Sequence, residues 1–151
     1  MARFDHRDII MELVELAGEL MDDVRQQVAY HRVSAYKTET AASVSRAIIR
    51  LRLVAEMTGD EAVADAFSDY DALCDNPEPS PVQDDCSFSH RVNHLMVSLG
   101  RAMEDLGVRV SSRDLPVEKL QDLPAMVIKR RREIVAVCRA GSRQQLFFQA
   151  V

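Results

Sequence analysis

Two histidines, His90 and His94, stand four residues apart, and on a helix this spacing projects both imidazoles from nearly the same side. Neutral imidazoles on one helix face are ligands that zinc accepts. However, spacing marks no third ligand, and neither a Cys-x-x-Cys pair nor the glutamate of an H-E-x-x-H motif accompanies them. His90 and His94 are therefore only weak candidates for metal ligands. We predict no metal site and no cofactor, and expect both histidines on a helix surface.

The segment around these histidines, residues 88–95, reads Phe-Ser-His-Arg-Val-Asn-His-Leu. It resembles the phosphoacceptor helix of histidine kinases and histidine phosphotransfer domains, which are also helical bundles with a solvent-facing histidine. The resemblance implies phosphotransfer through His90 and covers about one helix. It departs from the family because His90 falls in the first turn of the expected helix and no ATP-binding domain accompanies it. Histidine phosphotransfer is kept as an alternative function.

Carboxylates recur near the amino terminus at Glu12, Glu15, Glu19 and Asp22. This E-x-x-E pattern resembles that of all-α nucleotide pyrophosphohydrolases, and the resemblance implies Mg²⁺ held on nucleotide phosphates. Those enzymes need a second acidic pair, E-x-x-D, on another helix, and this chain does not present one. A solvated acidic helix face is the simpler interpretation. Because Gly-rich phosphate loops and nucleophile motifs are also missing, we expect a non-enzymatic protein, with Mg²⁺-dependent nucleotide hydrolysis as an alternative.

Charge is distributed unevenly along the 151 residues, whose net charge is −5. Residues 1–107 hold 10 Lys and Arg against 20 Asp and Glu, a balance of −10, whereas residues 108–151 hold 9 against 4, a balance of +5. A continuous basic run, Lys129, Arg130, Arg131 and Arg132, is followed by Arg139. The run either packs against the acidic part of its own chain or of a second copy, or it meets an external partner. Nucleic acid is the less favoured partner, because no stacking aromatics lie near the run.

An apolar tail, residues 142–151, follows a glycine that should end the last helix, and it contains Leu146, Phe147 and Phe148. The tail either docks on the bundle or binds a partner. Residues 144–148 read Gln-Gln-Leu-Phe-Phe, which is similar to the Q-x-x-(Leu/Met)-Phe peptide that binds bacterial sliding clamps. Phe147 stands where that peptide has an aliphatic residue.

Helical periodicity of apolar residues dominates the chain, and no segment has the pattern of a strand. We predict major helices over about 5–31, 39–57, 87–106 and 123–140, a shorter one over 60–74, and a very short one between the Asp-Leu-Pro repeats at 114–116 and 122–124. Gly59, Gly107 and Gly141 should end helices, with residues 108–110 an extended link. Thr58 and Glu61 match a capping box. The three prolines within 75–87 predict a surface loop.

The predicted fold is therefore all-α, a single-domain bundle over residues 1–141 with the tail at 142–151. The three cysteines suggest reduced thiols, and neither a membrane span nor a signal peptide is indicated, so we expect a cytoplasmic protein without membrane contact.

We expect it to bind another protein as a regulator, adaptor or inhibitor, with a nucleic-acid-binding regulator as the second hypothesis. A homodimer is expected if the helix over 39–57, or the Met-bearing stripe of the helix ending at residue 106, is left partly uncovered. The candidate partner-binding residues are Lys129, Arg130, Arg131, Arg132, Arg139, Leu146, Phe147 and Phe148.

Overall fold

The computed structural model describes the backbone of residues 5–33, 37–75, 84–115, 118, 121 and 123–149. It describes the side chains of these residues except 30–33, 37–40, 84–87 and 137–149. The described residues form no strand and five α-helices, α1 (His6–Val33), α2 (Lys37–Thr58), α3 (Glu61–Asp75), α4 (Asp84–Ser111) and α5 (Leu123–Gln149). The chain is an all-α helical bundle, which confirms the predicted fold class.

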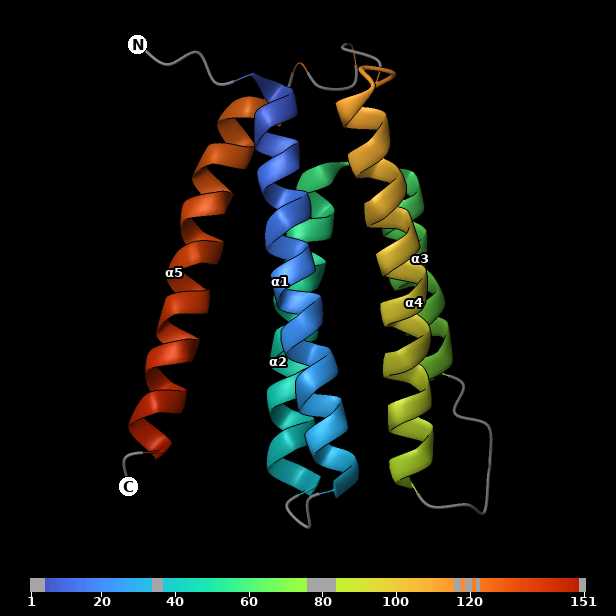
Figure 1. The fold of residues 1–151 in the computed structure, drawn as a ribbon, viewed down its shortest axis with the longest axis vertical. Helices are drawn as coiled ribbons and strands as arrows, with labels where there is room; N and C mark the ends of the chain where they lie inside the picture. Colours follow the sequence, from blue (N-terminus) through green and yellow to red (C-terminus); the bar gives the residue numbers. More distant parts are fainter. Residues whose placement is uncertain are drawn as a thin grey trace.

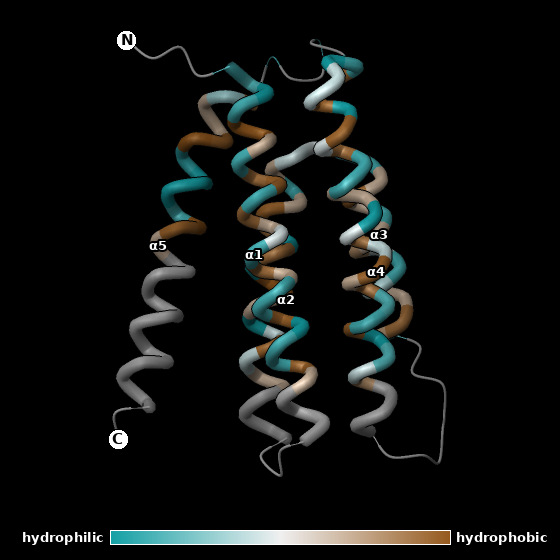
Figure 2. Tube along the Cα trace, in the orientation of Figure 1, coloured by the Kyte–Doolittle hydropathy of each residue, from teal (hydrophilic) through white to brown (hydrophobic). Residues whose placement is uncertain are grey.

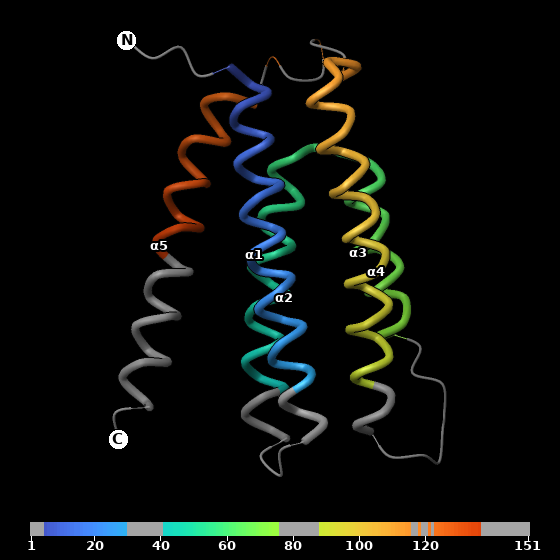
Figure 3. The backbone as a smooth tube through the Cα atoms, viewed as in Figure 1, coloured from blue at the N-terminus to red at the C-terminus, as the bar shows by residue number. Residues whose placement is uncertain are grey.

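Consecutive helices run antiparallel, as Figures 1 and 3 show from the colouring along the chain. Helix α1 packs against α2 and α4, and α3 packs against α4, so these four helices surround one core. Helix α5 lies outside this group against α2 and α1. No helix in the described part of the chain combines the length and the hydrophobicity that a bilayer crossing requires.

The core is built almost entirely from aliphatic and methionine side chains, because the sequence contains no Trp and few aromatics. Apolar residues recur along each helix at three- and four-residue steps, and Figure 2 shows polar segments between them. Helix α4 contributes Leu95, Leu99, Met103 and Leu106, all close to fully buried. Among the described side chains of α5, only Val127 and Ile134 are fully buried. Over its described side chains, α5 therefore contributes fewer buried residues to the core than any other helix.

Helix α4 differs from its predicted bounds at both ends. It begins at Asp84, within the predicted loop, and continues through Gly107 to Ser111, so the expected stop at Gly107 and the extended link over 108–110 were wrong. A glycine inside a helix costs only about 1 kcal/mol, and burial of Val110 continues the apolar face beyond it. Residues 76–83 of the predicted loop, with its prolines, lie outside the described residues.

The end of α4 is a Schellman motif centred on an arginine. Arg113 has a φ of 65°, in the left-handed region that usually selects glycine. The amide of Asp114 donates to the carbonyl of Arg109 at 3.1 Å, and the amide of Arg113 donates to the carbonyl of Val110 at 3.3 Å. These bonds satisfy the last carbonyls of the helix without a glycine, which is why the sequence pattern did not locate this end.

The corner between α2 and α3 confirms one predicted feature and corrects another. Gly59 has a φ of 65° and ends α2, as expected. The cap of α3 is Asp60 rather than Thr58, because the helix begins at Glu61 and the amide of Val63 donates to Asp60 Oδ1 at 3.2 Å. Thr58 instead donates its hydroxyl to the carbonyl of Ala55 at 2.7 Å.

Helix α5 also continues past its predicted end. It runs through Gly141 to Gln149, because the residues after the glycine are compatible with a helix and one glycine does not stop it. Most of the short helix predicted between the Asp-Leu-Pro repeats lies outside the described residues.

Replacement of Arg113 by glycine should stabilise the protein. The exposed side chain makes no hydrogen bond or ion pair with a described residue, and glycine removes the steric cost of the left-handed conformation. We therefore expect Arg113→Gly to raise the free energy of unfolding by about 1 kcal/mol. Urea denaturation measures this change. The same substitution at Arg46, an exposed position inside α2, is the matched control and should lower stability by about the same amount. A loss of stability at both positions would contradict the assigned conformation of Arg113.

Candidate functional site

The basic run on α5 divides into two pairs of side chains. Arg131 Nη2 lies 2.7 Å from Glu12 Oε2 on α1, and Arg130 Nη1 lies 3.8 Å from Glu56 Oε2 on α2. Both arginines are partly exposed, so each ion pair contributes at most about 1 kcal/mol. Lys129 and Arg132 are exposed and have no ion-pair partner among the described residues. The run thus both attaches α5 to the acidic bundle and presents cations to solvent.

The remaining predicted binding residues lie farther along the same helix. Arg139, Leu146, Phe147 and Phe148 fall within the backbone of α5, but their side chains lie outside the described residues. The choice between a docked tail and a partner-binding tail therefore stays a prediction.

The carboxylates near the amino terminus do not come together as a cation site. Glu12 is paired with Arg131, and Asp22 is paired with Arg25 at 3.1 Å, while Glu15 and Glu19 are exposed on α1. Among the described side chains, no three His, Cys, Asp or Glu residues form a group that could hold a metal ion. This arrangement gives the E-x-x-E resemblance no second set of ligands.

The two histidines occupy the outer face of α4. His90 and His94 are both exposed, and because α4 begins at Asp84, His90 lies in the second turn rather than the first. Their exposure agrees with the prediction that both histidines lie on a helix surface. We find no described carboxylate or cysteine positioned with them as a metal group.

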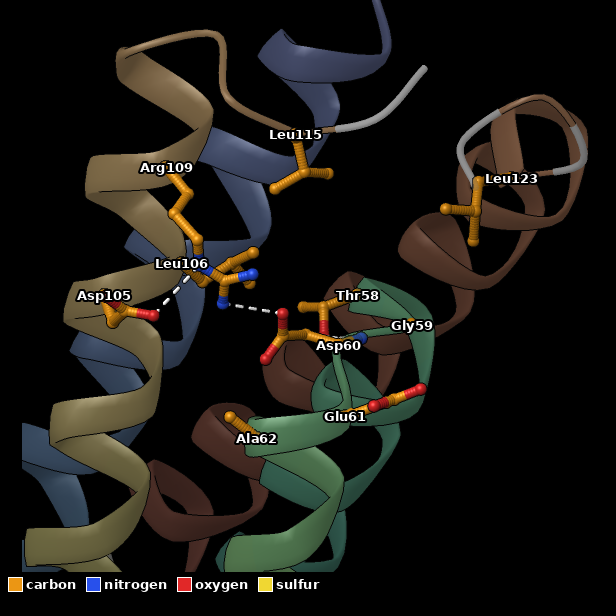
Figure 4. A pocket seen from close by; sticks show the side chains of 10 residues that line it. All are labelled: Thr58, Gly59, Asp60, Glu61, Ala62, Asp105, Leu106, Arg109, Leu115 and Leu123. Atoms are coloured by element: carbon orange, nitrogen blue, oxygen red, sulfur yellow. Dashed lines mark hydrogen bonds and ion pairs between the residues drawn. The ribbon is translucent and has the colours of Figure 1, made fainter. Parts of the chain in front are cut away.

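A pocket with both charged and apolar walls lies where the α2–α3 corner meets the end of α4, and the sequence did not predict a site there. Its volume is about 440 Å³. The lining residues are Thr58, Gly59, Asp60, Glu61, Ala62, Asp105, Leu106, Arg109, Leu115 and Leu123. Figure 4 shows Asp60 and Arg109 pointing toward one another, with Leu115 on the chain that follows α4 and Leu123 at the start of α5.

Asp60 joins two helices through its two carboxylate oxygens. Oδ1 caps α3, and Oδ2 accepts a hydrogen bond from Arg109 Nη2 at 2.7 Å, as the dashed line in Figure 4 shows. Arg109 Nε also donates to Asp105 Oδ2 at 2.9 Å. The hydrogen bond to Asp60 is the main reason that the pKa of Arg109 is raised above its ordinary value. Arg109 thus keeps its positive charge.

We call Asp60, Asp105 and Arg109 the clasp, because their hydrogen bonds join α3 to α4. The clasp is a structural link rather than a reactive centre. The carboxylates of Asp60 and Asp105 already accept bonds from Arg109, so neither is positioned as a free general base. The clasp was missed because Asp60 was not recognised as a cap, and because Arg109 lies beyond the glycine that was expected to end the helix. The apolar residues Leu106 and Val110, four positions apart, are the sequence signal that the helix continues past Gly107 and carries Arg109 toward α3.

A second polar cluster lies between α2, α3 and α4. Arg52 on α2 forms an ion pair with Asp71 on α3 and stacks over the ring of Phe67, 5.4 Å from its centroid. Burial, reinforced by a hydrogen bond with Cys74, raises the pKa of Tyr70 to about 12. The phenol therefore stays protonated at physiological pH, and this cluster serves to join helices.

Comparisons of the chain with models of protein families, with curated proteins and with solved structures found no match.

The clasp should make a measurable contribution to stability. We expect Asp60→Ala to lower the free energy of unfolding by about 2 kcal/mol, because it removes both the helix cap and the partner of Arg109. Asp60→Asn should cost about 1 kcal/mol, since the amide oxygen can still cap α3. Urea denaturation measures both values.

Asp69→Ala, at an exposed position on the same helix, is the control and should change stability by about 0.5 kcal/mol or less. If both Asp60 variants were as stable as this control, the clasp would make no contribution.

Proposed function

We propose that this protein is a non-enzymatic regulator, adaptor or inhibitor that binds an acidic surface of another protein through α5. The observation that carries the proposal is the division of the basic run: Arg130 and Arg131 hold α5 against the bundle, which leaves Lys129 and Arg132 exposed on its other side. A helix fixed in this way presents cations from an ordered element, which reduces the entropy that a partner must overcome on binding.

Apolar groups accompany these cations. The outer face of α5 consists of exposed side chains, Ala125, Met126, Lys129, Arg132, Glu133 and Ala136, and its two cations outnumber its one carboxylate. Met126 is 54% exposed, and methionine side chains adapt to partners of different shape. A basic face that also carries apolar groups suits a partner whose carboxylates surround a small apolar area.

Charge in the rest of the molecule favours protein over nucleic acid as the partner. Two of the four cations in the run are already paired with Glu12 and Glu56, and the bundle that carries α5 has a strong negative balance. Binding to a phosphate backbone gains affinity from each phosphate neutralised, and few cations remain for that purpose. The Mg²⁺-dependent hydrolase alternative is less favoured, because the described residues form no group of three His, Cys, Asp or Glu side chains that could hold the ion.

The outer face of α5 can be tested with a photo-crosslinking residue in place of Ala136. Crosslinking in the native host, followed by mass spectrometry, should identify a protein, and the affinity of the purified pair can then be measured by titration calorimetry. Because Lys129→Glu/Arg132→Glu opposes two contacts at the interface, we expect the double variant to weaken binding by about tenfold or more.

Arg46→Glu/Arg113→Glu carries the same charge change at exposed positions outside α5, and its affinity should stay within about twofold of the unmodified protein. Deletion of residues 142–151 measures the contribution of the tail separately. The proposal would be wrong if both double variants bound the crosslinked protein equally well, or if only DNA or RNA bound and lost affinity in Lys129→Glu/Arg132→Glu.

A further inference from the structure

We infer that two copies of this chain associate through the outer face of α4, as an antiparallel pair of helices. The basis is a line of exposed residues on α4, spaced alternately four and three residues apart. We call these residues the α4 stripe: His90, His94, Val97, Arg101, Glu104 and Val108. Alternating steps of four and three place side chains along one side of a helix, as at the contact positions of a coiled coil.

The stripe lies opposite the apolar face that α4 buries. On one side α4 approaches α1, where a Cβ added to Gly107 would meet Val14 at 3.5 Å, and on the other side Arg109 reaches Asp60 at the start of α3. Helix α5 packs on α1 and α2, away from the α4 stripe, as Figure 1 also shows. No described segment of the chain covers the stripe.

Two large apolar side chains on the stripe are exposed to solvent. Val97 is 53% exposed and Val108 is 61% exposed. The Met-bearing face of α4, by contrast, is buried, with Met96 and Met103 in the core, so it cannot serve as the dimer surface considered from the sequence. The accessible apolar groups of α4 thus lie on the side that sequence periodicity assigned to solvent.

The order of residues in the stripe is self-complementary. When two copies of α4 run antiparallel, Val97 lies opposite Val108 of the second copy, and Arg101 lies opposite Glu104 of the second copy. A two-fold axis repeats each contact, which gives two valine pairs and two ion pairs. In antiparallel coiled coils, an a position of one helix faces a d position of the other in this way. Closed dimers use the same surface on both subunits.

Charge also selects the direction of pairing. A parallel arrangement would place Arg101 against Arg101 and Glu104 against Glu104, and like charges at contact positions are repulsive. Neither Arg101 nor Glu104 has a hydrogen-bond or ion-pair partner among the described residues, so pairing with a second copy breaks no contact described here. From Val97 to Val108 the stripe spans about 16 Å, so the contact belongs to the small, readily reversible class.

Helix α2 offers a competing surface that is less available. Ile49 is 60% exposed, and Arg46 and Glu56 flank it and Leu53 along the helix. Glu56 is already the partner of Arg130 on α5, and Leu53 is more covered than either valine of the α4 stripe. The α4 stripe has no such competing contact, and we assign the interface to it.

Sedimentation velocity of the full chain, from about 10 μM to about 1 mM, tests the assignment because a small interface populates its dimer over this range. The unmodified protein should show a reversible monomer–dimer equilibrium. Arg101→Glu and Glu104→Arg each create two like-charge contacts, so each should raise the dissociation constant by about tenfold or more. An equimolar mixture of the two variants should recover the dimer, since every contact between unlike copies then joins opposite charges. The double variant Arg101→Glu/Glu104→Arg should recover it as well.

Asp69→Arg carries the same charge change as Glu104→Arg on the exposed face of α3 and should leave the equilibrium unchanged. Circular dichroism melts confirm that each variant is folded. A protein that stays monomeric throughout, single variants that dimerise normally, or a mixture that fails to recover would each overturn the assignment. So would a dimer lost in Arg46→Glu but retained in Arg101→Glu. The test is independent of the proposed function, because Lys129→Glu/Arg132→Glu should not affect dimerisation.

Discussion

The apolar face of α4 is the constraint on which the arrangement of this bundle depends. This helix packs against both α1 and α3, and its buried residues, from Val92 to Val110, close the core along nearly its whole length. Burial on that face fixes the rotation of the helix. The rotation then decides that Arg109 faces the start of α3, and that Val97 and Val108 face away from the bundle.

Helix α5 is attached in a different way. It buries few of its described side chains and is held by Arg130 and Arg131 on carboxylates of α2 and α1, so part of its attachment depends on exposed charges that salt screens. The uneven charge of the chain is thus partly compensated within the fold. Part of the positive segment is neutralised by the acidic bundle, and part remains as exposed cations, on which the proposed binding of a partner rests.

Periodicity of apolar residues was sufficient to predict the helices, because each helix buries a stripe at three- and four-residue steps. Gly59 was also located correctly, since it needs a positive φ. Gly107 and Gly141 were misread as helix ends, because their conformation depends on neighbours that the sequence does not show.

The candidate sites were less predictable than the helices. Asp60 and Arg109 are 49 residues apart, and only the packing of α4 on α3 brings them together. The basic run was recognised, but its division into anchored and exposed cations depends on where α1 and α2 lie relative to α5. The α4 stripe was likewise not predicted, because it includes Val108, which lies beyond the helix end that Gly107 was expected to mark.

Amide hydrogen exchange in α4 tests the central claim most directly, because the clasp and the α4 stripe both require an unbroken helix to Ser111. The amides of Val108 and Val110 should exchange with protection within about tenfold of that at Leu106, which lies two and four residues before them. Exchange at Val108 and Val110 close to the rate of an unstructured chain, with Leu106 still protected, would contradict the account.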